Sequence, residues 1–410
     1  MSRVRELAPK GPVRGRLISR KEIVEYVRKE LKTHVPANTL RASQHLLYCL
    51  NLVDASFDYE ASLVKLLGSQ LAGFYDTREK TMFLAVDLAA DERRITLSHE
   101  LVHALQDQHY DLDELTRSRP DSSDRDSAIQ ALAEGDATSA MLEAMLEGSH
   151  RSALDMPEDV LRVGMRSFIE LSPDTADVPS IVKRSLVAPY VDGIEFVHFL
   201  RRRSGWSGVD AAWRHPPVST EQVLHPDRFL AGENPEPIAI PKNSLVGRSE
   251  PEYHDILGEQ TLRILFEEWM PEGTASEAST GWAGDRVAVF SEDRRYVTAW
   301  HVRYDSRASA KRALIGFARG ILRPELAGSG SASAPFVTLH TAQSAVAADQ
   351  VCQERKERGP FAAARRGRDL GIIAGPTGSS SGDARGKSGS PGCPGALKWA
   401  EALSQQQTGP

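Results

Sequence analysis

The run HELVH at residues 99–103 combines two histidines and a glutamate at the spacing that a helical metal site needs. On an α-helix, residues i and i+4 lie one turn apart on the same face, so the imidazoles of His99 and His103 can both reach one tetrahedral Zn²⁺. Glu100 then approaches the zinc-bound water, where it can take a proton as the water attacks a carbonyl and pass that proton to the leaving amine. The alternative is a partly buried surface helix whose two histidines are incidental.

A catalytic zinc needs a third protein ligand and one open position. His109 follows His103 by only six residues and lies outside the i+4 row, so we expect it to cap the helix end or to meet solvent. Glu134, in ALAEGDAT near the start of the next long helix, is the better candidate. Gly135 and Ala137 beside it would let that helix approach the HELVH helix closely. The alternative for Glu134 is an ordinary exposed glutamate that interacts with the helix dipole.

Four further residues are candidates for supporting roles at this site. Thr138 lies one turn after Glu134 and could hydrogen-bond to a ligand histidine and orient it. Asp136 faces away from Glu134 by helical spacing, which favours a cap or a salt bridge. His225, in PPVSTEQVLHP, is a candidate catalytic residue that could stabilise the oxyanion on the attacked carbonyl, or it could simply pack. Tyr190, in VAPYVDG, is a second oxyanion candidate.

Around these side chains, the spacing of apolar residues changes from that of β-strands to that of α-helices. LAGFYD and TMFLAV, joined by the turn-like TREK, predict two short strands immediately before the HELVH helix. Such a strand pair could offer an edge to an extended substrate, or it could be a purely structural hairpin. The segment SAIQALAEGDATSAMLEAML predicts the helix of Glu134, and further helices are predicted at 157–170 and 192–202.

Several separated motifs together carry a family resemblance: AGFYD, LSHELVHALQDQHYDL, ALAEGDAT and PPVSTEQVLHP. HExxH followed some thirty residues later by EGxA resembles the gluzincin branch of zinc metallopeptidases. More closely, residues 1–320 are similar to a group of uncharacterised bacterial proteins classed as metallopeptidases, many of them exported. The resemblance implies a zincin-like domain with His99, His103 and Glu134 as ligands of one Zn²⁺ and Glu100 as base. Thr138 stands where many gluzincins have an acidic residue.

The whole chain is predicted to be an α+β protein with three regions. Residues 1–250 form the helix-rich zincin-like domain with its small β-hairpin or sheet. Residues 251–323 form a small α+β unit, in which a hairpin built from DRVAVFS and YVTAWHVRY lies between two helices. Residues 324–410 are rich in Gly, Ser, Ala, Arg and Pro, and we expect them to be disordered. The abrupt shift to residues with GC-rich codons also suggests an out-of-frame C-terminus.

Composition excludes several classes of partner. The net charge of −6 gives no global basic surface for nucleic acid. No apolar run approaches the roughly 20 residues of a membrane-spanning helix, and the basic start lacks the apolar stretch of a signal peptide, so the localisation stays open. Cys49, Cys352 and Cys393 have the spacing of neither a zinc knuckle nor a disulfide framework.

The sequence therefore predicts a zinc-dependent peptidase that binds one Zn²⁺ per chain and acts on a peptide or protein substrate. Two alternatives stay open. One is a catalytically silent protein of zincin fold that acts as a binding or scaffold module, although the presence of the base and all three ligands argues against it. The other is a zinc amidase or deacylase on non-peptide substrates, which no residue in the sequence separates from a peptidase.

Overall fold

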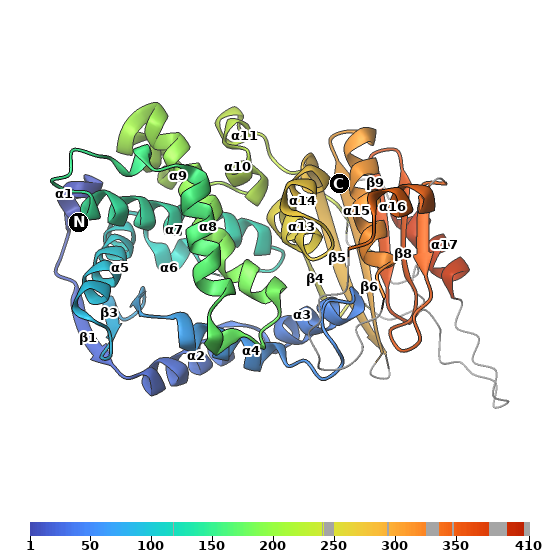
Figure 1. The fold of residues 1–410 in the computed structure, drawn as a ribbon, viewed down its shortest axis with the longest axis horizontal. Helices are drawn as coiled ribbons and strands as arrows, with labels where there is room; N and C mark the ends of the chain where they lie inside the picture. The colour runs from blue at the N-terminus through green and yellow to red at the C-terminus, as the bar shows by residue number, and fades with distance from the viewer. Residues whose placement is uncertain are drawn as a thin grey trace. The chain divides into compact units, whose positions relative to one another are not determined.

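The computed structural model describes residues 1–117, 119–239, 241, 250–292, 295–324, 336–346, 348–376 and 392–405. Helices and two separate sheets make up these residues, which confirms the predicted α+β class (Figure 1). The chain divides into two compact units. Unit 1 consists of Met1–Val35, Glu60–Arg119 and Asp124–Asn234, and unit 2 of Pro36–Tyr59, Pro120–Ser123 and Pro235–Pro410.

The predicted domain boundaries at residues 250 and 323 are therefore wrong. Residues 36–59 lie in unit 2, although they come early in the sequence. The stretches 251–323 and 324–410 also belong to one unit instead of a domain and a tail. Local periodicity could not show this, because membership of a unit depends on long-range packing.

Unit 1 is mainly helical and carries a small sheet. Its elements are α1 (Ser2–Arg5), β1 (Arg14–Ile18), α2 (Arg20–His34), α4 (Tyr59–Gln70), β2 (Gly73–Asp76), β3 (Thr81–Ala85), α5 (Ala90–Tyr110), α6 (Leu112–Leu115), α7 (Ser123–Met145), α8 (Glu158–Glu170), α9 (Ser180–Arg214), α10 (Thr220–Leu224) and α11 (Pro226–Ala231). In Figure 1, α5 lies beside this sheet, in agreement with its packing against β2 and β3.

The strand pair predicted before the HELVH helix is present as β2 and β3, which are antiparallel. Strand β1 pairs with β3 in parallel, so the sheet order is β1-β3-β2 and β2 is an edge strand. Asp107 on α5 fixes this hairpin against the helix. Its carboxylate accepts hydrogen bonds of 2.8 Å from the Tyr75 hydroxyl and from the Lys80 ammonium group. Polar contacts to the buried Asp107 carboxylate thus help to set the position of the HELVH helix relative to β2.

Helices α7 and α9 touch through a pair of glycines. A methyl group on Gly135 would lie 2.1 Å from the carbonyl oxygen of Gly193, and one on Gly193 would lie 2.0 Å from that of Ala131. Only glycine fits at either position. The close approach predicted from Gly135 is therefore real, but its partner is α9 and not the HELVH helix.

His198 on α9 is fully buried, and neither ring nitrogen has a hydrogen-bond partner among the described residues. Burial lowers its pKa to about 4, and the nearby charges of Arg201 and Arg202 act in the same direction. The folded protein therefore holds this imidazole neutral under conditions where an unfolded histidine begins to take up a proton.

Stability should consequently depend on pH through His198. As the pH falls below about 6.5, His198 binds a proton in the unfolded chain, whereas in the folded chain it stays neutral down to about pH 4. Stability is fully present above the unfolded pKa, and we expect a loss on the order of 2 kcal/mol by pH 5. His198→Leu should remove this loss in urea denaturation at pH 7.5 and 5.0, whereas His215→Leu, at an exposed histidine, should keep it. An equal loss in wild type and His198→Leu would contradict the assignment.

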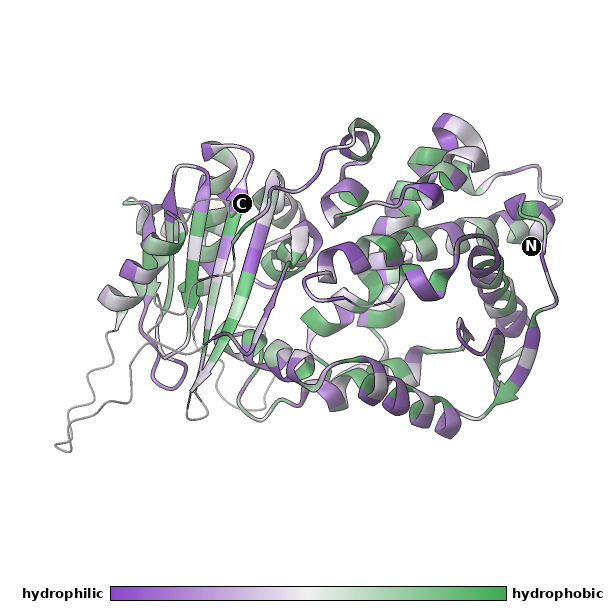
Figure 2. Ribbon diagram, turned by 180° about the vertical axis from the view of Figure 1, so that it is seen from behind, coloured by the Kyte–Doolittle hydropathy of each residue, from purple (hydrophilic) through white to green (hydrophobic). Residues whose placement is uncertain are grey.

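Unit 2 is built on one antiparallel sheet of order β4-β5-β6-β9-β8-β7. Its elements are α3 (Ala37–Cys49), β4 (Tyr253–Asp255), α13 (Gly258–Glu267), α14 (Glu272–Ser279), β5 (Trp282–Glu292), β6 (Arg295–Tyr304), α15 (Arg307–Ile321), α16 (Leu339–Ala345), β7 (Gln350–Gln353), β8 (Phe361–Arg366), β9 (Asp369–Ala374) and α17 (Cys393–Leu403). Figure 2 shows hydrophobic and hydrophilic bands alternating along its strands. The predicted hairpin of 251–323 is the pair β5 and β6.

The predicted disorder of residues 324–410 is wrong for the part that the structure describes. Strand β9 pairs with β6 from Thr298 to Arg303, so a segment from each side of residue 324 shares one sheet. Ala396, Ala400 and Leu403 on α17 are fully buried in the same core. The alanine-rich sequence lacks periodicity, but its small side chains pack closely once β6 supplies a partner. This shared sheet argues against an out-of-frame segment through β9. Residues 325–335, 377–391 and 406–410 lie outside the described residues.

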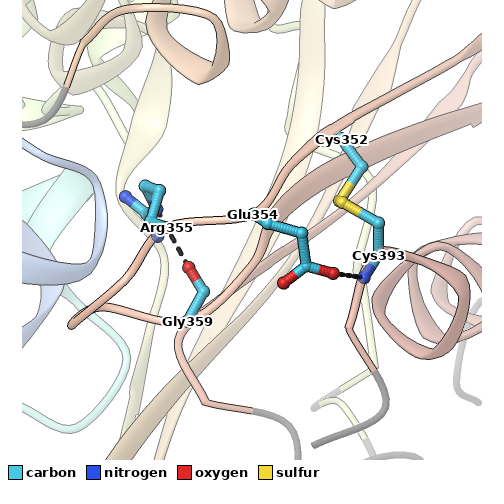
Figure 3. The surroundings of a disulfide bond; sticks show 5 residues. All are labelled: Cys352, Glu354, Arg355, Gly359 and Cys393. Carbon is cyan, nitrogen blue, oxygen red and sulfur yellow. Dashed lines mark hydrogen bonds between the residues drawn. A yellow bond between two sulfur atoms is a disulfide. The ribbon is translucent and has the colours of Figure 1, made fainter.

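A disulfide joins Cys352 on β7 to Cys393 at the start of α17, with the two Cα atoms 5.7 Å apart (Figure 3). The backbone N–H of Cys393 also donates a hydrogen bond to the Glu354 carboxylate. The spacing of the cysteines, which fits no disulfide framework, did not indicate this bond. Their 41-residue separation carries no motif, and their proximity follows only from the folding of the tail. Cys49 is a free, buried thiol.

Loss of this disulfide should destabilise the protein. Closing a loop of this length restricts the unfolded chain and is worth about 4 kcal/mol at most. We expect Cys393→Ser to lower the free energy of unfolding in urea and to abolish its sensitivity to reductant. Cys49→Ala is the control, because it should retain that sensitivity. A wild-type protein that unfolds identically with and without reductant would contradict a stabilising disulfide.

Among the helices within the described residues, none has both the length and the apolar character that crossing a membrane requires.

Candidate metal centre

The three predicted ligands converge on one point in unit 1. Nε2 of His99 and Nε2 of His103 lie 3.1 Å apart, and Oε2 of Glu134 lies 3.1 Å from the first and 3.4 Å from the second. Tetrahedral zinc with bonds of about 2.0–2.1 Å separates its ligand atoms by about 3.3 Å. The donor atoms therefore already have the spacing that one zinc ion requires.

Within the residues that the structure describes, the side chains of His99, His103 and Glu134 lie close enough together to hold a metal ion. The two imidazoles and the carboxylate are each 13 % exposed, so they are largely shielded from water while one side stays accessible. Two nitrogens and one oxygen are a donor set typical of catalytic zinc, with a fourth position left for water or substrate. The chemistry of the residues fits the predicted ion.

Helix α5 presents both histidines on one face, with ring centroids 4.7 Å apart and ring planes at 81°. Helix α7 supplies Glu134. The two helices are tied together beside the cluster, because the side-chain amide of Gln106 on α5 donates a 3.0 Å hydrogen bond to the carbonyl of Ala133. The Glu134 carboxylate on α7 is thereby held in position relative to the histidines on α5.

Gln106 contacts the cluster and was not singled out from the sequence. Its amide nitrogen donates to Ala133 and, at 3.1 Å, to Oδ2 of Asp136, so its oxygen must face His103. That oxygen lies 2.9 Å from Nδ1 of His103 and can only accept a hydrogen bond. The contact assigns the proton of His103 to Nδ1 and leaves the Nε2 lone pair for a metal. The i, i+3 spacing of the two residues was the available signal.

Thr138, predicted to orient a ligand histidine, is buried on α7, but within the described part of the chain no hydrogen bond joins it to His99 or His103. Gln106 makes that contact instead. The predicted salt bridge of Asp136 is confirmed, with Arg5 as its partner. His109 neither caps its helix nor simply meets solvent, because its ring hydrogen-bonds to the carbonyl of Ala8 at 2.7 Å.

The electrostatics of the metal-free cluster favour an anionic ligand carboxylate. Burial alone would raise the pKa of Glu134, but the charge of His103 and hydrogen bonds from both histidines hold it well below its usual range. Burial conversely lowers the pKa of His103, and Glu134 outweighs this and raises it to about 9.

Glu100, the predicted base, is buried beside the cluster. Burial raises the pKa of its carboxyl group, and the charges of His103 and His99 oppose this rise. The carboxylate also accepts a hydrogen bond from the backbone N–H of Tyr75 on β2. Glu100 therefore lies between the cluster and the outer edge of β2.

The two oxyanion candidates differ in their placement. Tyr190 on α9 lies at the cluster, with its ring centroid 6.2 Å from that of His99 and its hydroxyl hydrogen-bonded to Glu134. Burial and the neighbouring carboxylates raise its pKa well above 10, so it stays a hydrogen-bond donor. His225 ends α10 and precedes Pro226 at the start of α11, and it is not a member of the metal cluster. Its catalytic role stays a prediction.

Comparison with known proteins finds a family match within unit 2. The family model described as "Domain of unknown function (DUF8575)" matches residues 246–384, all of them in unit 2. No curated protein and no solved structure matches the chain. The match extends across residue 324, which further argues against a change of frame at that point. It does not include α5 or α7, so the interpretation of the metal cluster depends on the geometry alone.

Proposed function

We propose that this protein is a zinc-dependent hydrolase and, more specifically, a peptidase. The observation that supports the proposal most strongly is the convergence of His99, His103 and Glu134 at zinc-ligand spacing, with Glu100 beside them. A zinc ion bound there would polarise a carbonyl oxygen and favour the attack of water at neutral pH. Those four residues are the ligands and the base of the proposed reaction.

The remaining chemistry is supplied by side chains of the chain itself. Glu100, made more basic by burial, takes a proton from the attacking water and returns it to the leaving amine. Tyr190 stays protonated next to Glu134, and its hydroxyl can donate a hydrogen bond to the oxygen of the attacked carbonyl.

Strand β2 favours a peptide over a small non-peptide amide as substrate. It lies at the edge of its sheet, and the backbone N–H of Tyr75 points outward to Glu100 instead of pairing with β3. An extended peptide that pairs with this edge would run past the cluster, held by backbone hydrogen bonds that select little for side chains. We therefore expect broad specificity for extended peptides.

The test is hydrolysis by the full chain loaded with zinc, offered a quenched-fluorescent peptide library and, in parallel, N-acylated amino acids. We expect peptide cleavage that a chelator abolishes and added zinc restores. Cleavage of the N-acylated amino acids alone would replace the peptidase by a deacylase. Zinc binding without hydrolysis of either class would favour the catalytically silent alternative and overturn the proposal.

A further inference from the structure

The N-terminal segment Met1–Gly11 is attached to the C-terminal half of the HELVH helix. The backbone N–H of Lys10 donates a 2.7 Å hydrogen bond to Oε1 of Gln108, whose amide nitrogen donates in return to the carbonyl of Gly11 at 3.1 Å. The ring of His109 contacts the carbonyl of Ala8. The segment therefore follows α5 along the two turns that come after the ligand His103.

Arg5 inserts from this segment into the interior of unit 1. Its side chain is fully buried, and its guanidinium group donates to Oδ1 of Asp136 through Nε and to Oδ1 of Asp210 through Nη2, the latter at 2.7 Å. The guanidinium carbon also lies 4.6 Å from the ring centroid of Trp206. A buried cation is costly unless it is paired, so Arg5 and Asp136 must occupy the interior together.

The Arg5–Asp136 pair continues to the metal cluster through one further residue. Oδ2 of Asp136 accepts hydrogen bonds from the amide nitrogen of Gln106 and, at 2.8 Å, from Nε1 of Trp213. As an acceptor, Asp136 acts together with the Ala133 carbonyl to hold the Gln106 amide with its nitrogen turned away from His103. If the amide turned over, its nitrogen would face Nδ1 of His103 and favour the tautomer with the proton on Nε2, which cannot bind a metal through Nε2.

We propose that Arg5 is a positioning residue for the metal centre. Through Asp136 and Gln106 it holds His103 in the Nδ1-protonated tautomer, so tight metal binding requires the N-terminal segment to be docked. Withdrawal of this segment would therefore lower the affinity of the site for metal, although the segment does not contact the site itself. The proposal rests on the metal centre of the proposed function but not on catalysis.

The test compares zinc affinity in Arg5→Met and Asp136→Asn with that in Arg201→Met, by competition with a chromophoric chelator. Arg201 is a matched control: it is also buried, and its guanidinium carbon lies 4.0 Å from the ring centroid of Trp206, but it bonds to Ser139 and Glu143. We expect the first two variants to weaken zinc binding by about 10-fold, as loss of a residue that orients a ligand does. Arg201→Met should stay within about twofold of wild type even where thermal unfolding shows a similar loss of stability.

A second measurement separates positioning from general destabilisation. At a pH well above the His103 pKa of about 9, where the ring of the metal-free protein is neutral, its ¹⁵N shifts should report Nδ1 protonation in wild type and Arg201→Met, and a mixture of tautomers in Asp136→Asn. Equal zinc affinities in Arg5→Met, Asp136→Asn and Arg201→Met would overturn the proposal. If Arg5→Met does not fold, Asp136→Asn decides the matter alone. A wild type that binds no zinc overturns both the metal centre and this inference, whereas zinc binding without peptide hydrolysis overturns only the proposed function.

Discussion

Glu100→Gln should leave the zinc content at about one per chain while it lowers peptide turnover by about 10²- to 10⁴-fold. The amide has nearly the same shape as the carboxylate but cannot accept a proton from the attacking water. Because Glu100 is not one of the three clustered donor groups, its replacement should spare metal binding. The measurement is kcat on a cleaved peptide together with elemental analysis of the same sample.

Glu92→Gln is the matched control for this change, since Glu92 is exposed near the start of the same helix, two turns before the cluster. It should leave turnover unchanged. Full activity in Glu100→Gln would contradict the assigned base. A loss of zinc in that variant would instead show that Glu100 supports the metal and not the proton transfer.

Glu134→Ala should weaken zinc binding by more than about 100-fold, because removing a ligand must cost more than removing a residue that only orients one. Two neutral imidazoles would remain, without the anionic carboxylate that lies 3.1 Å and 3.4 Å from them. Glu143→Ala, on the same helix but paired with Arg201, is the control and should retain zinc. The measurement is competition with a chelator of known affinity, and unchanged affinity in Glu134→Ala would exclude it as a ligand.

The clustering of His99, His103 and Glu134 could be predicted from the sequence, because much of it depends on short-range geometry. The i, i+4 spacing places His99 and His103 on one helical face wherever the helix lies. The place of Glu134 beside the two histidines was predicted from its position on the next long helix and from the family resemblance. The contact of Gln106 with His103 could have been predicted from the same helical spacing. The contact of Arg5 with Asp136 could not, because the two residues are 131 positions apart in the sequence.

The fold shows the same division between local and long-range information. The strands β2 and β3 carry a clear pattern with a turn between them, and both are present. Strands β7 to β9 carry no comparable pattern, and their place in the sheet depends on long-range pairing, because β9 pairs with β6, β8 with β9 and β7 with β8. The Cys352–Cys393 disulfide depends on the same long-range pairing. Sequence periodicity alone could not reveal either feature.

The most direct test of the metal centre is an anomalous difference map at the zinc absorption edge, from crystals of the full chain grown with one equivalent of zinc. We predict one strong peak at about 2.0–2.1 Å from Nε2 of His99, Nε2 of His103 and a carboxylate oxygen of Glu134. A peak bound by other side chains, or no peak at this cluster, would contradict the metal centre and the function derived from it.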